Sequence, residues 1–530
     1  MLFTSYRFLE FLLVLFLLYY ILPARWQWKV LLVAGFVFYF CANPIYCVYI
    51  AVTIFTTWYA GCKIEALREK STVYLQEHKE SLSKEERKSY KAAVKHKTWI
   101  WTLSCLLFNL GILAVVKYTN FAISNINSVM KAFGSVGELG FVDIIVPLGI
   151  SFYTFQAVGY IIDVYRGTVE AEKNIFRFAL FVSFFPQLVQ GPISRFGDLK
   201  KTLFEEHPFD KKTICFGLQR ILWGYFKKLV IADRILTGVN ALIHNTDTYT
   251  GAYVFVGMLF YALELYADFT GGIDITIGIA QTMGIEVTEN FRRPYFSKNI
   301  KEYWNRWHIT MGSWFTDYIF YPISVCKPML KLSKFSRNHF GEFIGKRVPV
   351  YLSSFVVWFA TGIWHGASWN FIAWGLGNWL VIMASQELEP LYKKFHNRFH
   401  VEGKFGFRLF QVVRTVLLMS CLRLFDCYRD VPLTFRMFGS MFTAGNWNIL
   451  WNGSLLNIGL TVTDYCILLC GLVLLIAVSL LQRSGSVREK IAGLPFWGRF
   501  LLWYGLFLTV LLMGAYGIGY DSSQFIYNQF

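Results

Sequence analysis

Charged residues are scarce in this chain. Asp, Glu, Lys and Arg together make up 16% of its 530 residues, whereas about 25% is usual in soluble domains. Hydrophobic residues make up 55%, and the mean hydropathy is +0.42. Many apolar runs are long enough to cross a hydrocarbon core of about 30 Å. This composition excludes an ordinary soluble domain and predicts an all-α polytopic membrane protein.

Acidic residues are also few relative to basic ones. The chain has 34 Asp and Glu against 51 Lys and Arg, a formal net charge of +17. The basic residues lie between the apolar runs, in five segments: 63–97, 195–228, 327–347, 393–414 and 483–499. Under the positive-inside rule these segments are cytoplasmic and face anionic lipid. The charge therefore predicts topology and membrane lipids as partners, and no nucleic acid.

Several patterns that carry chemistry are missing. The ten cysteines form no CxxC pair, which predicts small buried hydrophobes rather than a disulfide framework. No HExxH, G-x-S-x-G, P-loop or G-x-G-x-x-G pattern occurs, which argues against a zinc peptidase, a serine hydrolase, an ATPase and a dinucleotide enzyme. His396 and His400 have no third ligand nearby in the sequence. We expect no metal site and no bound cofactor.

Thirteen apolar runs are candidate spans: about 8–22, 30–43, 45–61, 99–117, 144–162, 175–191, 214–236, 252–283, 313–326, 350–384, 409–427, 464–481 and 497–517. Prolines and glycines interrupt several of them, so we expect about eleven full crossings, with re-entrant or short helices that line a cavity. The run 252–283 is expected to break at Gly271 and Gly272, and the run 350–384 near His365. With the basic segments inside, the first span runs inward and the last outward, which places both termini outside.

One histidine lies inside an apolar and aromatic run. In "GIWHGASWNFIAWGLGNWLV", residues 362–381, His365 is the sole titratable side chain. An ionisable group at membrane depth is costly unless it faces a cavity or a partner, so it predicts function. The structural alternative is a packed histidine bonded to a backbone carbonyl of a neighbouring helix.

A second histidine follows a tryptophan-rich stretch. In "NIKEYWNRWHITMGSWFTDYIFYPIS", residues 299–324, aromatic residues and a methionine recur at helical spacing and predict one amphipathic helix. His308 falls on or beside the apolar face of this helix, and it therefore points to the interior. His308 and His365 lie 57 residues apart, so they can meet only through the fold.

Three acids occur in the apolar stretch "FYALELYADFTGGIDITIGIA": Glu264, Asp268 and Asp274. Acids at membrane depth pair with cations or line functional sites. Here they are expected to pair with a cation or to cap a broken helix at the two glycines. We therefore favour structural support over catalysis for Asp268 and Asp274.

Five sequence blocks occur in a fixed order: "SFFPQLVQGPISRF", "YADFTGGID", "ENFRRPYFSKNIKEYWNRWHIT", "SWFTDYIFYP" and "GIWHGASWNFIAWG". Together they resemble the membrane-bound O-acyltransferase (MBOAT) family, most closely its bacterial branch of alginate O-acetyltransferases and the D-alanyl transferase of teichoic acid synthesis. The resemblance covers about 140–385, and the end "AYGIGYDSSQFIYNQF" is also similar. It implies a single membrane domain over 1–530, with spans in 1–61, a cytoplasmic helical loop at 62–98 and further spans in 409–530. The helices are expected to surround a central funnel or tunnel.

The resemblance also implies residue roles. His365 matches the catalytic histidine of the W-H-G block, and His308 matches the second histidine of the R-W-H block. Four neighbours are expected to bind substrate: Trp304, Asn305, Arg306 and Trp364. The implied reaction is transfer of an acetyl-type group from a cytoplasmic thioester, acetyl-CoA, to a hydroxyl of a cell-surface or secreted polysaccharide. A secreted or membrane-anchored SGNH-type partner is expected to complete the transfer at a bacterial cell membrane.

Buried histidines suit this chemistry. Burial disfavours the imidazolium form, so a membrane histidine stays neutral and can accept the proton of an alcohol. The leaving thiolate comes from a thiol with a pKa near about 8.5, so no serine nucleophile is required. His365 can act as a base or carry the acyl group, and both routes stay open. His308 would orient the donor or stabilise the developing oxyanion.

Three other functions remain open from the sequence. One is transfer of D-alanine from a carrier-protein thioester toward teichoic acid. Another is a transporter or polymer channel whose histidines relay protons. The last is a lipid or lysophospholipid acyltransferase.

Overall fold

The computed structural model describes residues 3–134 and 137–516, and within these residues it contains helices and no β-strand. Most of the end block "AYGIGYDSSQFIYNQF" lies outside the described residues. The chain forms two compact units. The first reaches Ile214 and includes Met283–Val287, and the second comprises Cys215–Thr282 and the described residues from Thr288 on.

Seven stretches of the described chain are long and apolar enough to cross a membrane. They are α3 (Pro44–Glu77), α4 (Lys84–Ala132), α11 (Ala252–Thr282), α15 (Lys327–His365), α18 (Phe405–Tyr428), Val462–Ser484, and α22 (Phe496–Met513). The predicted all-α polytopic membrane fold is confirmed. The count of eleven crossings stays a prediction. Helices α1 (Tyr6–Ile21) and α2 (Gln27–Ala42) have 16 residues each, and each rises only about 24 Å of the about 30 Å needed.

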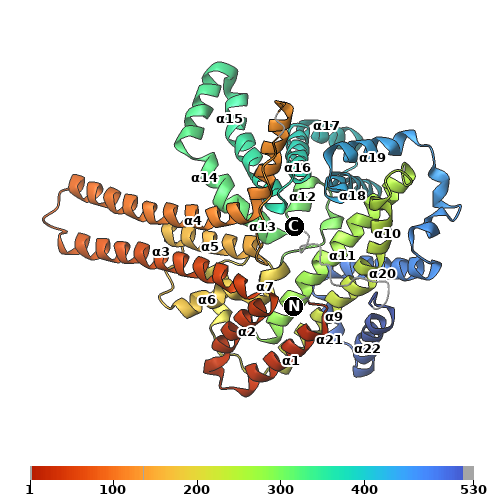
Figure 1. Cartoon of the computed structure of the whole chain (residues 1–530), viewed down its shortest axis with the longest axis horizontal. Coiled ribbons are helices and arrows are strands. Elements are labelled where there is room, and N and C mark those ends of the chain that lie inside the picture. The colour runs from red at the N-terminus through yellow and green to blue at the C-terminus, as the bar shows by residue number, and fades with distance from the viewer. Residues whose placement is uncertain (1–2, 135–136, 517–530) are drawn as a thin grey trace. The chain divides into compact units, whose positions relative to one another are not determined.

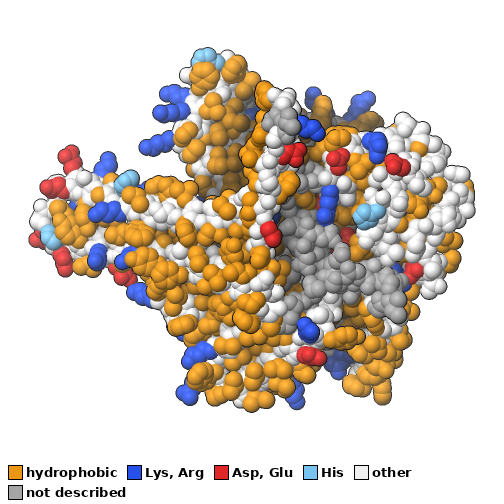
Figure 2. Space-filling view, viewed as in Figure 1, with side chains coloured by type: hydrophobic (Ala, Val, Ile, Leu, Met, Phe, Trp, Pro, Cys, Tyr) orange, Lys and Arg blue, Asp and Glu red, His pale blue; other side chains and the backbone are white. Residues whose placement is uncertain are grey.

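The first unit is built around a long helical hairpin. Helices α3 and α4 pair with each other, and α4 alone has 49 residues. The Ser83 hydroxyl and the Glu86 carboxylate form a capping box at the start of α4, which satisfies backbone N–H groups there. The basic segment 62–98 is thus helical on both sides of a short turn. Charged side chains gather over the tip of this hairpin, and apolar ones cover the rest of it (Figure 1, Figure 2).

Four further helices complete the first unit: α5 (Ile150–Arg166), α6 (Ile175–Ser183), α7 (Phe185–Gln190) and α8 (Phe196–Leu203). Helix α5 packs against α3 and α4, and almost every one of its residues is buried. Two of its buried polar groups bond within the protein: Gln156 Nε2 donates to Gln187 Oε1 at 3.0 Å, and the Tyr160 hydroxyl accepts from the Glu172 N–H at 2.8 Å. A helix buried on all sides is expected to be apolar all round, and α5 departs from this because Ser151, Gln156 and Asp163 are buried in it as well.

Helix α11 is the buried axis of the second unit. It packs against α10 (Asp233–His244), α18, α19 (Val431–Thr443) and the π-helical turn η2 (Phe226–Ala232). The unit also contains most of α9 (Lys211–Tyr225), and α16 (Trp369–Glu387), α17 (Glu389–Phe399), α20 (Val462–Leu481), α21 (Val487–Ala492) and α22. Helix α22 has no buried residue. Within the second unit, α11 is thus largely buried, whereas every residue of α22 is at least partly exposed.

The expected break at Gly271 and Gly272 is wrong, because α11 runs without interruption through both residues. These glycines serve packing instead. A Cβ on Gly271 would lie 3.0 Å from the Gly224 carbonyl oxygen, and one on Gly278 would lie 2.8 Å from the Gly217 carbonyl oxygen. Small residues let two helix backbones approach closely in a membrane. The glycines of α11 thus hold α9 against it.

The expected single helix over 299–324 is also wrong. The stretch divides into α12 (Ile300–Trp304), α13 (Ile309–Phe315), the π-helical turn η4 (Thr316–Phe320) and α14 (Tyr321–Ser324). The chain breaks at His308, which has a left-handed backbone with φ 49°. Bonds to another segment replace the helical ones: Ile309 N–H donates to the Asn290 carbonyl at 3.0 Å, and Arg292 N–H donates to the Arg306 carbonyl at 2.9 Å. Helical spacing alone cannot reveal such partners. The expected break near His365 is confirmed, since α15 ends there and α16 begins at Trp369.

Candidate functional site

His365 is the last residue of α15, and its side chain is 8% exposed. Its ring meets the Trp364 ring edge-on at 4.9 Å and the Trp374 ring edge-on at 4.8 Å between centroids. Glycines around it bring α15 and α16 together, because a Cβ on Gly375 would lie 2.4 Å from the Trp358 carbonyl oxygen. The local sequence thus places His365 where two closely packed helices meet.

His308 is buried in the turn between α12 and α13, with a side chain 1% exposed. Its Nδ1 lies 3.3 Å from Asn290 Oδ1, which also accepts bonds from the Thr310 N–H at 3.1 Å and the Thr310 hydroxyl at 2.9 Å. Burial, together with the Arg423 guanidinium, lowers the pKa of His308 to about 3. His308 is therefore neutral at physiological pH.

Trp364 is the common neighbour of the two histidines. Its ring centroid lies 6.0 Å from that of His308 and 4.9 Å from that of His365. All three side chains belong to the second unit and are buried. The fold therefore brings the two predicted histidines into one aromatic cluster. Their catalytic roles stay predictions.

The four residues expected to bind substrate divide into two pairs. Trp304 meets the Trp374 ring at 5.9 Å, and its buried Nε1 has no hydrogen-bond partner among the described residues. With Trp364, it belongs to the aromatic cluster. Asn305 is exposed, and Arg306 pairs with Glu302 at 2.5 Å. The ring contacts therefore place the two tryptophans, Trp304 and Trp364, in the cluster.

The two acids expected to give structural support form ion pairs, Asp268 in a fully buried position and Asp274 in a partly buried one. Asp268 Oδ1 lies 2.6 Å from Lys228 Nζ, which also lies 2.8 Å from Asp233. Asp274 lies 2.6 Å from Lys227 Nζ and 2.8 Å from Arg220 Nε. Removing one partner of a buried pair is strongly destabilising. This pairing is what structural support requires, and the assignment itself stays a prediction.

Sequence reasoning missed Arg423, which lies beside the histidine cluster. Its guanidinium carbon lies 5.3 Å from the Trp307 ring centre and 4.8 Å from the Trp374 ring centre. Its Nη1 lies 3.6 Å from Asp426 Oδ2, and both side chains are buried. A signal was present, because an arginine in the apolar run 409–427 is an ionisable group at membrane depth. Asn290 was missed as well, and no local pattern marks it.

The chemistry of the histidine cluster follows from the side-chain groups that it contains. No group of three or more His, Cys, Asp or Glu in the described part of the chain is placed to hold a metal ion. The groups that can act on a substrate are two imidazoles, a guanidinium and indole N–H groups. Such a set can move protons and stabilise a developing negative charge in a site from which aromatic rings exclude water.

Comparison with known proteins identifies the family. Residues 171–424 match the model of the MBOAT, membrane-bound O-acyltransferase family. This match begins later than the expected 140 and extends past 385 to include Arg423. The chain is 31% identical over 454 residues to "Probable alginate O-acetylase AlgI" of Azotobacter vinelandii, covering 85% of this chain and 79% of that protein. The chain therefore belongs to the membrane-bound O-acyltransferase family and is an O-acyltransferase.

Other relatives carry different names. The chain is 29% identical to the "Peptidoglycan O-acetyltransferase" of Helicobacter pylori over 56% of this chain and 57% of that protein. It is 30% identical to the "Teichoic acid D-alanyltransferase" of Bacillus subtilis over 47% of this chain and 61% of that protein. The predicted resemblance to the alginate O-acetyltransferase-like branch is confirmed.

Proposed function

We propose that this multi-pass O-acyltransferase moves an acetyl group from cytoplasmic acetyl-CoA to a hydroxyl of a cell-surface or secreted polysaccharide, in a bacterial cell membrane. The extent of similarity supports this acceptor and acyl group, since the match to an alginate O-acetylase covers 85% of the chain. An SGNH-type partner, secreted or anchored in the membrane, completes the transfer outside. Both termini face outside in this arrangement, with the basic segments toward acetyl-CoA.

The observation that carries the proposal is the position of both histidines against Trp364. His365 removes the proton from the acceptor hydroxyl as its oxygen attacks the thioester carbonyl. The new C–O bond forms, the C–S bond breaks, and the thiolate takes the proton back from the His365 imidazolium. His308 is neutral, and because its Nδ1–H faces the acceptor Asn290 Oδ1, its Nε2 is a hydrogen-bond acceptor that can orient the thioester donor.

The aromatic rings around His365 support the same reaction by excluding water. Trp364, Phe371 and Trp374 are buried and contact the imidazole ring. Water that reached the thioester would hydrolyse it, so exclusion protects the donor until the acceptor arrives. A closed aromatic layer also strengthens each electrostatic interaction within it.

A second candidate is transfer of D-alanine from a carrier-protein thioester toward teichoic acid. The similarity to a teichoic acid D-alanyltransferase favours it, although this match covers 47% of the chain. A transporter or polymer channel whose histidines relay protons would use the same buried imidazoles without acyl turnover. A lipid acyltransferase would place the acyl group on a membrane lipid instead.

One experiment separates these functions. Purified protein in liposomes receives either radiolabelled acetyl-CoA or a D-alanyl carrier protein, with a soluble polysaccharide acceptor and its SGNH-type partner. Label in the polysaccharide from acetyl-CoA supports the proposal. Label only from the D-alanyl carrier, label in lipid, or polymer flux without acyl turnover contradicts it and selects the corresponding alternative.

A further inference from the structure

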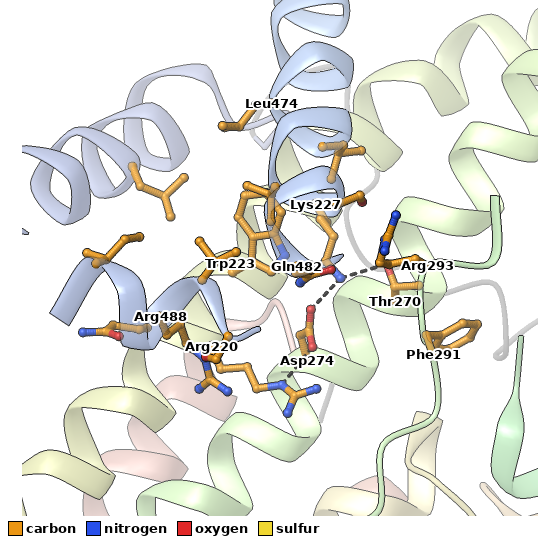
Figure 3. A pocket seen from close by; sticks show the side chains of 18 of the residues that line it. Arg220, Trp223, Lys227, Thr270, Asp274, Phe291, Arg293, Leu474, Gln482 and Arg488 are labelled. Carbon is orange, nitrogen blue, oxygen red and sulfur yellow. Dashed lines mark hydrogen bonds and ion pairs between the residues drawn. The ribbon is translucent and has the colours of Figure 1, made fainter. Parts of the chain in front are cut away.

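A cavity in the second unit is distinct from the histidine cluster. It has a volume of about 750 Å³ and is bounded by α9, η2, α11, α20, α21 and α22 (Figure 3). Neither His308 nor His365 lines it. Its volume falls within the range of about 300–1,000 Å³ that is usual for small-molecule sites.

One end of this cavity is cationic. Five basic residues and two carboxylates line it. In Figure 3 the Asp274 carboxylate lies between Lys227 and Arg220, and Arg220 also makes two bonds to Glu289, at 2.5 and 2.6 Å. The charges of Arg220 and Lys227 are thus balanced by these two carboxylates. The other basic residues that line the cavity give it a net positive charge.

Three arginines provide this surplus: Arg292, Arg293 and Arg488. Arg488 Nη1 donates to neutral acceptors, the Phe216 carbonyl at 2.7 Å and Gln281 Oε1 at 2.9 Å. Arg293 Nε is buried and has no hydrogen-bond partner among the described residues. Guanidinium groups without a carboxylate are suited to bind phosphate oxygens through two N–H bonds at once.

The other end of the cavity is apolar and belongs to two membrane spans. Leu474 and Val478 of α20 face it, together with Leu502 and Leu506 of α22. Helix α22 has no buried residue, and the sides of it that face neither the cavity nor η2 are open to lipid. An occupant must therefore combine an anionic group with a hydrocarbon part that runs along these spans.

We propose that this cavity binds an anionic phospholipid of the cytoplasmic leaflet, with its phosphate on Arg293 and Arg488 and one acyl chain between α20 and α22. Basic pockets between transmembrane helices on the cytoplasmic side bind such headgroups. The segment 483–499, which contains Arg488, is expected to be cytoplasmic. A phosphate on a soluble molecule shares the headgroup chemistry but would leave the apolar wall unfilled.

The test measures lipid binding to the full-length protein by native mass spectrometry and thermal shift. Phosphatidylglycerol is compared with phosphatidylcholine, and free glycerol phosphate and desulfo-coenzyme A are added as soluble phosphates. The double substitution Arg293→Gln and Arg488→Gln should weaken phosphatidylglycerol binding by about tenfold, to the level of phosphatidylcholine. The control removes the same charge from the exposed Arg398 and Arg408 and should leave binding unchanged.

A second variant probes the apolar wall without removing charge. Val478→Trp fills the cavity and should abolish the preference for phosphatidylglycerol, whereas Leu469→Trp on the exposed face of the same helix should not. Equal binding of the two lipids by the wild-type protein would overturn the proposal. It would also be overturned if glycerol phosphate or desulfo-coenzyme A displaced the lipid and lost affinity in the arginine variant. Because the readout is lipid binding, the result is independent of which acyl group the enzyme transfers.

Discussion

The Arg423 guanidinium lies over the face of Trp374, 4.8 Å from the ring centre, and the same ring meets His365 edge-on at 4.8 Å. The Trp374 ring thus contacts both a buried cation and the imidazole proposed as the base. An arginine on an aromatic face contributes about 0.5–2 kcal/mol when desolvated. Arg423 is therefore suited to hold the ring that positions His365.

Changing Arg423→Met should lower kcat by about tenfold or more with little change in KM, because a shift of about 1 Å in the reacting groups can reduce rate about a hundredfold. Arg423→Lys should recover only part of the rate, since an ammonium cannot stack as a planar guanidinium does. The exposed Arg436→Met serves as the control. A raised KM with unchanged kcat, or full recovery by lysine, would contradict a positioning role.

His365→Ala should reduce acyl transfer by about 10² to 10⁴-fold, the usual contribution of general-base catalysis. His365 is the last residue of α15, and its side chain lies in the aromatic cluster. We therefore expect normal expression of the variant and a monodisperse elution profile. His339→Ala, an exposed histidine that precedes the non-helical turn at Gly341 in α15, is the control. Activity within a few-fold of wild type at normal expression would favour the view that His365 is only a packed residue.

The double variant of His308 and His365 tests whether the two histidines act as one unit. His308→Ala should lower kcat, and the double variant should be scarcely worse than His365→Ala, because residues of one unit are strongly non-additive. The pKa of His308 is lowered to about 3, so its titration should not shape the rate between about pH 5 and 8. Additive losses, or a raised donor KM with kcat intact, would instead make His308 a packing or donor-binding residue.

Asp268→Asn should lower the free energy of unfolding by about 1.5–3 kcal/mol, because it removes one of the two carboxylates that pair with the buried Lys228. Asp268→Asn protein that remains folded should keep its kcat. Glu342→Gln breaks an exposed pair with Lys346 and should cost at most about 1 kcal/mol. Equal stability of the two variants, or loss of kcat in folded Asp268→Asn protein, would argue against structural support.

Membrane topology is tested by labelling single cysteines in a background that lacks the natural ones. Cysteines at Ser81, in the exposed turn between α3 and α4, and at the exposed Ser484 should react only after permeabilisation. A tag after Phe530 should be accessible in intact cells, since the last span is predicted to run outward. A tag that becomes accessible only after permeabilisation would reverse this arrangement.

Composition and local pattern were sufficient for the class of protein and for the expectation that both histidines are buried. The length of each apolar run shows by itself that the run can cross a bilayer. Several such runs exclude an ordinary soluble domain without any knowledge of tertiary contacts. His365 stood out for the same reason: an imidazole in an otherwise apolar run needs a partner or a cavity. The order of the five sequence blocks then indicated the family.

Contacts between distant segments decided the rest. His308 leaves the helix because Asn290 and Arg292, outside the local pattern, offer its neighbours other hydrogen-bond partners. Gly271 lies inside a continuous helix, where the absence of a side chain lets the α9 backbone at Gly224 pack closely against it. Arg423 reaches the Trp374 ring from another span. Periodicity describes one element at a time, whereas hydrogen bonds and close packing depend on which elements meet, and only the tertiary structure shows that.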